Sequence, residues 1–260
     1  MTILFIGDIV GRPGRQGLRT ALPSLRDRYA PDFVIANGEN AAAGFGVTRN
    51  VLAELWNMGV DCVTSGNHIW AKKEVEQFIG NEVRLLRPAN FPEGVPGRGA
   101  MVYRTEVGLP VAVVNLQGRT FMPPLDCPFA WADRNVDGLR EEAAALIVDF
   151  HAEATSEKQA LGRYLDGRVS AVIGTHTHVQ TSDEQILPGG TAYITDCGMT
   201  GPTDSIIGTR VAEILRRFTT QMPQKFEVAE GPVDVCGVVL EIDEESGSAR
   251  KISRLRERID

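Results

Sequence analysis

The sequence predicts a single α/β domain, and three observations favour this class. Short apolar runs alternate with amphipathic stretches through the first two-thirds of the chain, which is the pattern of β-α-β units. The last third is richer in segments of β type. The 260 residues, 43% of them hydrophobic and 23% charged, can build a sizeable core, and no shift in composition marks a domain boundary, so we expect one domain over 1–260.

Strands are expected where short runs of β-branched, aromatic and aliphatic residues end at glycine or at polar residues. A period close to two, with a Gly-Leu-Pro turn in the middle, predicts a hairpin across Gly99–Leu116. The other predicted strands, in chain order, are Thr2–Ile6, Asp32–Ala36, Val60–Thr64, Ala145–Phe150, Val169–Ile173, Phe226–Val228, Val235–Ile242 and Ala249–Leu255.

Helices are expected where apolar residues recur at three- and four-residue spacing. Leu18, Leu22 and Leu25 share such a face in the segment that follows the first strand. Thr48 is placed to cap the helix that follows the second strand. The other predicted helices lie near Glu74–Ile79, over Ser156–Leu165 and around Arg210–Phe218.

The segment 118–138 has little periodicity and contains three prolines and three phenylalanine or tryptophan residues. Loops of this length in compact domains are functional or disordered, and the aromatic content favours order. We therefore interpret it as a loop that lines or covers a functional site, in which Phe121 and Trp131 are available for stacking on a ligand. The alternative is a surface loop packed against the core.

The charge pattern restricts the partners of the protein. The net charge is −7 and no basic tract is visible, which argues against a broad nucleic-acid-binding surface. A small anionic substrate is compatible with this charge, because a bound cation can reverse the field inside one cleft. The sequence shows neither a secretion signal nor a membrane span, so we expect a cytoplasmic protein without a membrane role. A homo-oligomer is the expected form if the protein assembles, because most soluble oligomers consist of identical chains.

Residue types that bind metals follow the predicted strands. Each of the four histidines comes just after an apolar run, and so do two carboxylates and two amides. The carboxyl ends of strands in an α/β sheet converge on one crevice, so these side chains are expected to meet there. The two imidazoles of His-Thr-His can also reach one point from an extended segment. The candidates are Asp8, Glu39, Asn40, Asn67, His68, His151, His176 and His178.

Nitrogen and oxygen ligands of these types suit iron, manganese, zinc or cobalt, and the lack of cysteine among them argues against a closed structural zinc site. The ligands are too many for one ion, whereas two ions that share Glu39 would use them. Two divalent ions would leave the site cationic and suited to a phosphate ester. A hydroxide held between the ions would then be the nucleophile.

The order of these motifs resembles that of the calcineurin-like metallophosphoesterases. The motifs are Gly7-Asp8, Gly38-Glu39-Asn40, Gly66-Asn67-His68, His151 and Gly174-x-His176-x-His178. Three features depart from the usual series. Val10 stands where a histidine is usual, Glu39 followed by Asn40 replaces the bridging aspartate, and the glycine of the last motif lies one residue earlier, as Gly174. With these departures, and with the stretch from Thr195 to Pro202, the sequence is similar to a bacterial subfamily, the YmdB-like cyclic-nucleotide phosphodiesterases.

The resemblance implies a four-layered α/β/β/α sandwich and two sets of metal ligands. Asp8, Asn40 and His178 would hold one ion, with Asn40 in place of the missing histidine. The second ion would be held by Asn67, His151 and His176, and Glu39 would bridge the two. His68 would be the general acid that protonates the leaving oxygen. Iron or manganese is the expected metal, with zinc and cobalt as alternatives.

The resulting hypothesis is a dinuclear phosphodiesterase that hydrolyses 2′,3′- or 3′,5′-cyclic nucleotides. A phosphomonoesterase or protein phosphatase with the same site is the alternative among enzymes. Such an enzyme needs cationic side chains that bind a dianionic phosphate. Arg12, Arg15 and Arg119 are the candidates, because they lie near the ends of motifs. A metal-binding regulatory scaffold is the alternative outside enzymes, although a purely structural ion has no need of His68.

Overall fold

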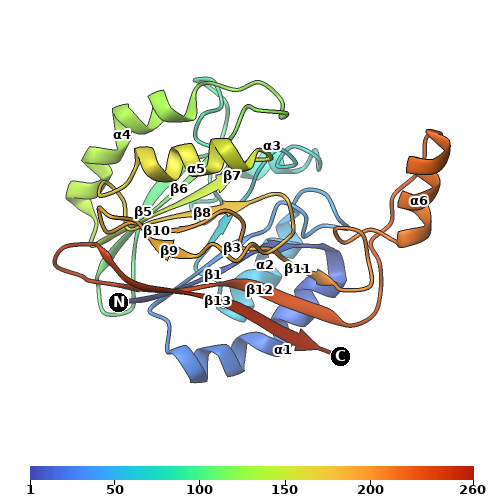
Figure 1. Ribbon diagram of the computed structural model, residues 1–260, viewed down its shortest axis with the longest axis horizontal. Helices are drawn as coiled ribbons and strands as arrows, with labels where there is room; N and C mark the ends of the chain where they lie inside the picture. The colour runs from blue at the N-terminus through green and yellow to red at the C-terminus, as the bar shows by residue number, and fades with distance from the viewer.

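Two β-sheets lie face to face in the computed structural model, which describes residues 1–260 (Figure 1). The first sheet contains, in spatial order, β2 (Asp8–Ile9), β11 (Met199–Pro202), β12 (Val233–Ile242), β1 (Thr2–Ile6), β3 (Phe33–Asn37) and β4 (Cys62–Thr64), and β13 (Ala249–Ile259) pairs with β12. The second contains β5 (Ala100–Arg104), β6 (Pro110–Gln117), β7 (Ala145–His151), β8 (Ala171–Thr175), β10 (Ala192–Ile194) and β9 (Gln185–Ile186).

Helices cover the outer face of each sheet. The first sheet carries α1 (Gly11–Tyr29) and α2 (Arg49–Met58), and the second carries α4 (Pro128–Glu142) and α5 (Thr155–Tyr164). The short α3 (Val75–Phe78) packs into the core of the first sheet, whereas α6 (Val211–Thr220) stands away from the body (Figure 1). The four-layered α/β/β/α sandwich is thus confirmed. None of these helices combines the length and apolar character that a membrane crossing requires.

Three hydrophobic cores hold the four layers together. On β1, Ile3 and Phe5 point into the core between the sheets, whereas Leu4 and Ile6 point into the core beneath α1. Alternate residues of a strand face opposite sides, so a strand buried on both sides reads as a continuous apolar run. The third core lies between the second sheet and its helices.

The predicted elements largely coincide with the observed ones. The predicted strand Thr2–Ile6 has the bounds of β1, and Thr48 caps α2 by accepting a hydrogen bond from the Val51 N–H at 3.2 Å. The expected hairpin is formed by β5 and β6, which pair antiparallel from Ala100 opposite Val114. Most other boundaries differ by a few residues, as helix and strand ends commonly do.

Two expectations about secondary structure are wrong. The segment 118–138 is not a loop throughout, because α4 begins at Pro128. Proline suits the first turn of a helix, and the buried face of α4 uses only Pro128, Ala132 and Val136, so the apolar pattern is sparse. The segment Phe226–Val228 is not a strand, because only Val228 pairs, through an isolated bridge to Thr209. Thr209 lies in a short turn, which is not long enough to pair with a whole strand.

The parallel strands bring distant segments to one edge of the molecule. In the first sheet β1, β3 and β4 are parallel, and in the second β6, β7 and β8 are parallel. Polar side chains at the carboxyl ends of these strands therefore gather at the seam between the two sheets.

The close approach of Gly174 in β8 to the next strand gives a test of this packing. A Cβ at position 174 would lie 1.7 Å from the Thr195 carbonyl oxygen, so Gly174→Ala should lower the free energy of unfolding by about 2–3 kcal/mol. Gly138→Ala is the matched control, because Gly138 is exposed in α4 with open space around it, and it should raise stability by up to about 1 kcal/mol. Urea denaturation followed by circular dichroism measures both, and equal effects would contradict the packing argument.

Candidate metal centre

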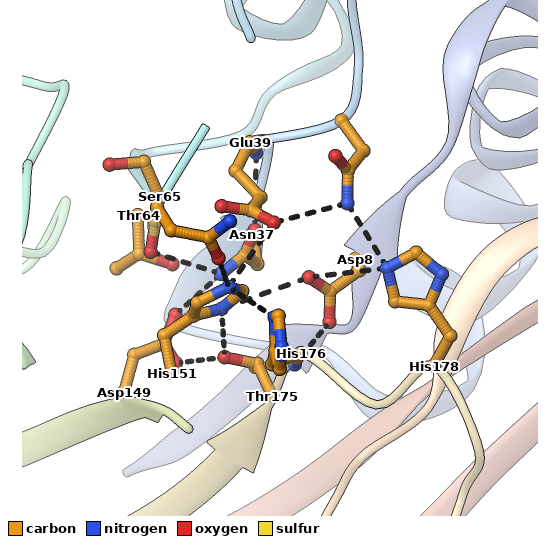
Figure 2. A network of polar contacts seen from close by, with 12 residues as sticks. Asp8, Asn37, Glu39, Thr64, Ser65, Asp149, His151, Thr175, His176 and His178 are labelled. Atoms are coloured by element: carbon orange, nitrogen blue, oxygen red, sulfur yellow. Dashed lines mark hydrogen bonds and ion pairs between the residues drawn. The ribbon is translucent and has the colours of Figure 1, made fainter. Parts of the chain in front are cut away.

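The structure brings all eight candidate residues together at the seam between the sheets. Figure 2 shows five of them, Asp8, Glu39, His151, His176 and His178, pointing toward one another. Asp8 begins β2 directly after β1, and Glu39 and Asn40 follow β3. Three other segments end at the same place: Asn67 and His68 follow β4, His151 ends β7, and His176 and His178 follow β8. Each sheet therefore contributes part of the cluster.

One group of candidate ligands surrounds the His151 ring. Its Nε2 lies 3.1 Å from Asn67 Oδ1, 3.0 Å from His176 Nδ1 and 3.1 Å from Glu39 Oε1. His151 and Glu39 are wholly buried. Three electron-donating atoms thus converge on one ring nitrogen.

The second group contains Asp8, Asn40 and His178. The Asn40 amide nitrogen donates to His178 Nε2 at 3.0 Å and to Glu39 Oε1 at 3.2 Å, and Asp8 Oδ1 lies 3.9 Å from His178 Nε2. Glu39 Oε1 therefore faces both groups. Amides coordinate metals through oxygen, and Asn40 Oδ1 instead accepts a hydrogen bond from His68 Nδ1 at 2.9 Å. Asn40 can serve as a ligand only with its amide turned around.

Three histidines direct their other ring nitrogen to an oxygen atom. His151 Nδ1 donates to Thr175 Oγ1 at 2.9 Å, His178 Nδ1 to the Ile207 carbonyl at 2.9 Å, and His176 Nε2 to Glu153 at 3.2 Å. These partners fix the tautomers, so the nitrogens that face the cluster carry lone pairs. The same arrangement orients the histidine ligands of metal sites.

The cluster fits a cation. With the tautomers above, His151 Nε2 and His176 Nδ1 each carry a lone pair and lie 3.0 Å apart. This close approach is favourable only if a proton or a metal ion lies between the two nitrogens. Asp8 Oδ1 is buried without a hydrogen-bond partner, which is costly for a carboxylate oxygen unless a cation lies near it. Glu39, His151 and His176 each offer a ligand atom within 4.8 Å of the others. The residues present therefore suit divalent metal ions.

The pKa directions show the same demand for positive charge. Burial opposes the ionised form of Glu39, but the neighbouring His151 outweighs burial and holds the pKa of Glu39 well below its usual range. Burial opposes the charged His151 ring in turn, yet Glu39 raises its pKa to about 9. Burial, followed by the charge of His151, lowers the pKa of His176 to about 3, so the His176 ring is neutral and available as a ligand. Burial raises the pKa of Asp8.

The sequence analysis missed the residues that support the histidines. Thr175 Oγ1 donates to Asp149 at 2.7 Å, and Asp149 also accepts from the Asn37 amide at 3.0 Å. Burial raises the pKa of Asp149 to about 6. Asp149 and Glu153 each lie two residues from His151, and Thr175 directly precedes His176, so spacing from the histidines was the available signal.

A buried ion pair supports the loop that carries the last two histidines. His176 has φ of 98° and His178 has φ of 67°, both in the left-handed region that is unfavourable for residues with side chains. Between them, the Thr177 N–H and hydroxyl both donate to Asp196, at 3.0 and 2.7 Å. Asp196 also lies 2.7 Å from the ammonium of Lys158, which is 1% exposed. Lys158 gave no sequence signal, because it is a single lysine on an amphipathic helix.

His68 lies beside the cluster without being enclosed by it. Its side chain is 32% exposed, its backbone N–H donates to Glu39 Oε2 at 3.1 Å, and its Nδ1 is bonded to Asn40. It lines a cleft with Glu39, Asn40, His176 and His178. No residue of 118–138 lines this cleft, because Trp131 packs against the core of the second sheet and Phe121 is 89% exposed. The aromatic residues of the cleft are Phe45 and Phe226.

Removal of the buried ammonium tests the support of the histidine loop. Lys158→Met leaves Asp196 as a buried charge, so it should lower the free energy of unfolding by about 3–5 kcal/mol. Lys225→Met removes the exposed pair with Glu227 and should cost less than about 1 kcal/mol. Chemical denaturation of both variants makes the comparison, and a small effect of Lys158→Met would show that the pair contributes little.

Neutralisation of the shared carboxylate tests the cation site. Glu39→Gln should lower the content of manganese retained after dialysis, since the amide keeps the shape of the side chain but loses its charge. Glu93→Gln, at an exposed position, should retain as much manganese as the unaltered protein. Inductively coupled plasma mass spectrometry measures the content, and equal retention in both variants would exclude Glu39 as a ligand.

Comparison with known proteins agrees with the architecture and the motifs. The model of the YmdB-like protein family matches residues 4–255. The chain is 54% identical over 255 residues to the 2′,3′-cyclic-nucleotide 2′-phosphodiesterase of Bacillus subtilis, covering 98% of this chain and 96% of the relative.

Two solved structures have the same fold over nearly the whole chain. A protein of Thermus thermophilus superposes with a TM-score of 0.93 at 46% identity, covering 99% of both chains. A protein of Mycoplasma pneumoniae, described as a novel phosphatase, also superposes with a TM-score of 0.93, at 34% identity over 99% of this chain and 93% of its own. The full-length match of the family model and the identity with these relatives show that the chain belongs to the YmdB-like protein family.

Proposed function

We propose that the protein is a dinuclear metal-dependent phosphodiesterase that hydrolyses 2′,3′-cyclic nucleotides. The observation that carries this proposal is the shared position of Glu39 Oε1, 3.1 Å from His151 Nε2 in one group and 3.2 Å from the Asn40 amide in the other. A carboxylate shared between two groups of ligands is well placed to serve a pair of neighbouring ions. The substrate class rests on the extensive identity with the Bacillus subtilis enzyme.

The two groups of residues would each hold one ion. Asp8 and His178, with Asn40 after a turn of its amide, form one set, and Asn67, His151 and His176 form the other. Manganese or iron suits these nitrogen and oxygen ligands, with zinc and cobalt as alternatives. Divalent ions in such a site supply Lewis acidity toward phosphoryl oxygens and activate water.

The residues of this chain position the substrate and supply a proton. In hydrolysis of a 2′,3′-cyclic nucleotide at the 2′ position, the bond from phosphorus to O2′ breaks, hydroxide from water adds to phosphorus, and O2′ takes up a proton. His68 is placed to donate that proton, because it lines the cleft beside Glu39 and its ring is held by Asn40. The product is then a 3′-nucleotide.

The charges of the cleft favour a diester over a monoester. None of its 18 lining residues is lysine or arginine, so a dianionic monoester finds no side-chain cation there. Arg15 donates a hydrogen bond to Glu54, and Arg119 donates one to the sulfur of Cys127. Arg12 lines two other grooves and not this cleft. The arginines that a phosphomonoesterase would need are therefore directed elsewhere.

A substrate panel tests the proposed reaction. The manganese-loaded protein should hydrolyse 2′,3′-cyclic AMP and bis-p-nitrophenyl phosphate faster than p-nitrophenyl phosphate. Preference for the monoester would favour a phosphomonoesterase. Absence of turnover on all three, with two metal ions bound per chain, would favour the regulatory scaffold.

The acid role of His68 has its own test. His68→Ala should retain the bound metal but lower kcat for 2′,3′-cyclic AMP by about 10²–10⁴-fold, the range typical of a proton-transfer group. The loss should be much smaller for bis-p-nitrophenyl phosphate, because p-nitrophenolate departs without a proton. Loss of metal in this variant, or equal losses on both substrates, would show that His68 acts in another way.

A further inference from the structure

The cleft beside the metal cluster has two chemically different walls. Its volume is about 470 Å³, which suits a small organic ligand. One wall is formed by the cluster residues described above. The rest of the lining is mainly apolar and includes Val10, Phe45, Ile207, Ile214, Phe226 and Val228.

Three of the apolar side chains are partly exposed to solvent, although hydrogen bonds fix the backbone of the turns that carry Phe45 and Ile207. Phe45 is 40% exposed, Phe226 is 37% exposed and Ile207 is 53% exposed. Phe45 lies in a turn closed by the Ala42 N–H, which donates to the Gly46 carbonyl at 2.9 Å. Its ring packs edge-on against His68, with ring centres 4.9 Å apart. An aromatic surface thus lies next to the proposed acid.

Ile207 is held in a costly conformation. Its φ is 48°, and a β-branched residue rarely occupies this left-handed region. Reciprocal backbone hydrogen bonds between Ile206 and Thr209, at 2.9 and 3.0 Å, close the turn around it, and its carbonyl accepts from His178 Nδ1. Strain of this kind persists where neighbouring structure imposes it, often at binding sites. The apolar wall is therefore joined to the metal cluster through His178.

The charges of the cleft select among aromatic ligands. Glu153 and Glu227 line it besides Glu39, and no lysine or arginine does. A second phosphate, as in the next nucleotide of an RNA chain, would meet acidic groups without a side-chain cation. A flat, uncharged ring can instead stack on the aromatic side chains.

We propose that Phe45, Ile207 and Phe226 form a subsite for the base of a mononucleotide and determine the preference for nucleoside cyclic phosphates over cyclic phosphates without a base. This inference rests on the proposed function, because it assigns the cyclic phosphate to the cluster and the base to the apolar part of the lining. The aromatic contact comes from Phe45 and Phe226 instead of from Phe121 and Trp131.

The test compares two substrates that share the five-membered cyclic phosphate. These are 2′,3′-cyclic AMP and glycerol 1,2-cyclic phosphate, which has no base. Loss of a stacking side chain should lower the ratio of their kcat/KM values by about 5- to 150-fold, mainly through KM for the nucleotide. Phe45→Ala and Phe226→Ala are the test variants, and Phe226 has no ring contact with His68. Phe121→Ala is the control, because Phe121 is exposed and lies outside the cleft.

Calorimetric binding of 3′-AMP gives a second readout, in which both test variants should bind more weakly than the Phe121→Ala control. If the unaltered protein hydrolyses both substrates and the ratio is the same in all three variants, the subsite is wrong and the proposed function stands. If the metal-loaded protein hydrolyses neither substrate, the proposed function fails and the subsite fails with it.

Discussion

The burial of the Glu39 carboxylate is the constraint on which the rest of the site depends. An ionised carboxylate without partners is very costly in the interior of a protein. Glu39 is wholly buried, and its partners are the His68 N–H, the Asn40 amide and the His151 ring. One of its oxygens faces both groups of candidate ligands, so positive charge at this point stabilises the whole cluster. The raised pKa of His151 reflects the same requirement, because a proton on the His151 ring supplies positive charge beside Glu39.

The two-sheet architecture meets this requirement because each sheet supplies part of the cluster. Asp8, Glu39 and Asn67 come from the first sheet, and His151 and His176 come from the second. The hydrophobic core between the sheets contains 19 buried residues drawn from both of them, and protein interiors are close-packed, so this core holds the strand ends in a fixed relation. Donor atoms about 3 Å apart across the seam need this rigidity, since small shifts between the sheets would separate them.

The backbone between the second sheet and the cleft links the cluster to the proposed base subsite. His176 and His178 adopt left-handed conformations, which the bonds of Thr177 to the buried Lys158–Asp196 pair help to maintain. His178 in turn bonds to the Ile207 carbonyl, another residue in the left-handed region. Unfavourable backbone conformations thus accumulate between the metal cluster and the cleft, where they set the positions of functional side chains instead of adding stability.

Much of the fold and of the cluster could be predicted because the signals were local. A few neighbouring residues are enough to indicate the apolar run of β1, the Thr48 cap and the position of each histidine at the end of a strand. Parallel strands then bring these ends together. What only the tertiary structure decided is which side chains meet across layers. The Lys158–Asp196 pair, the bond from His176 to Glu153 and the contact between Phe45 and His68 join segments 23 to 38 residues apart. No local pattern encodes them, because they depend on how the sheets pack and how the loops between their strands turn.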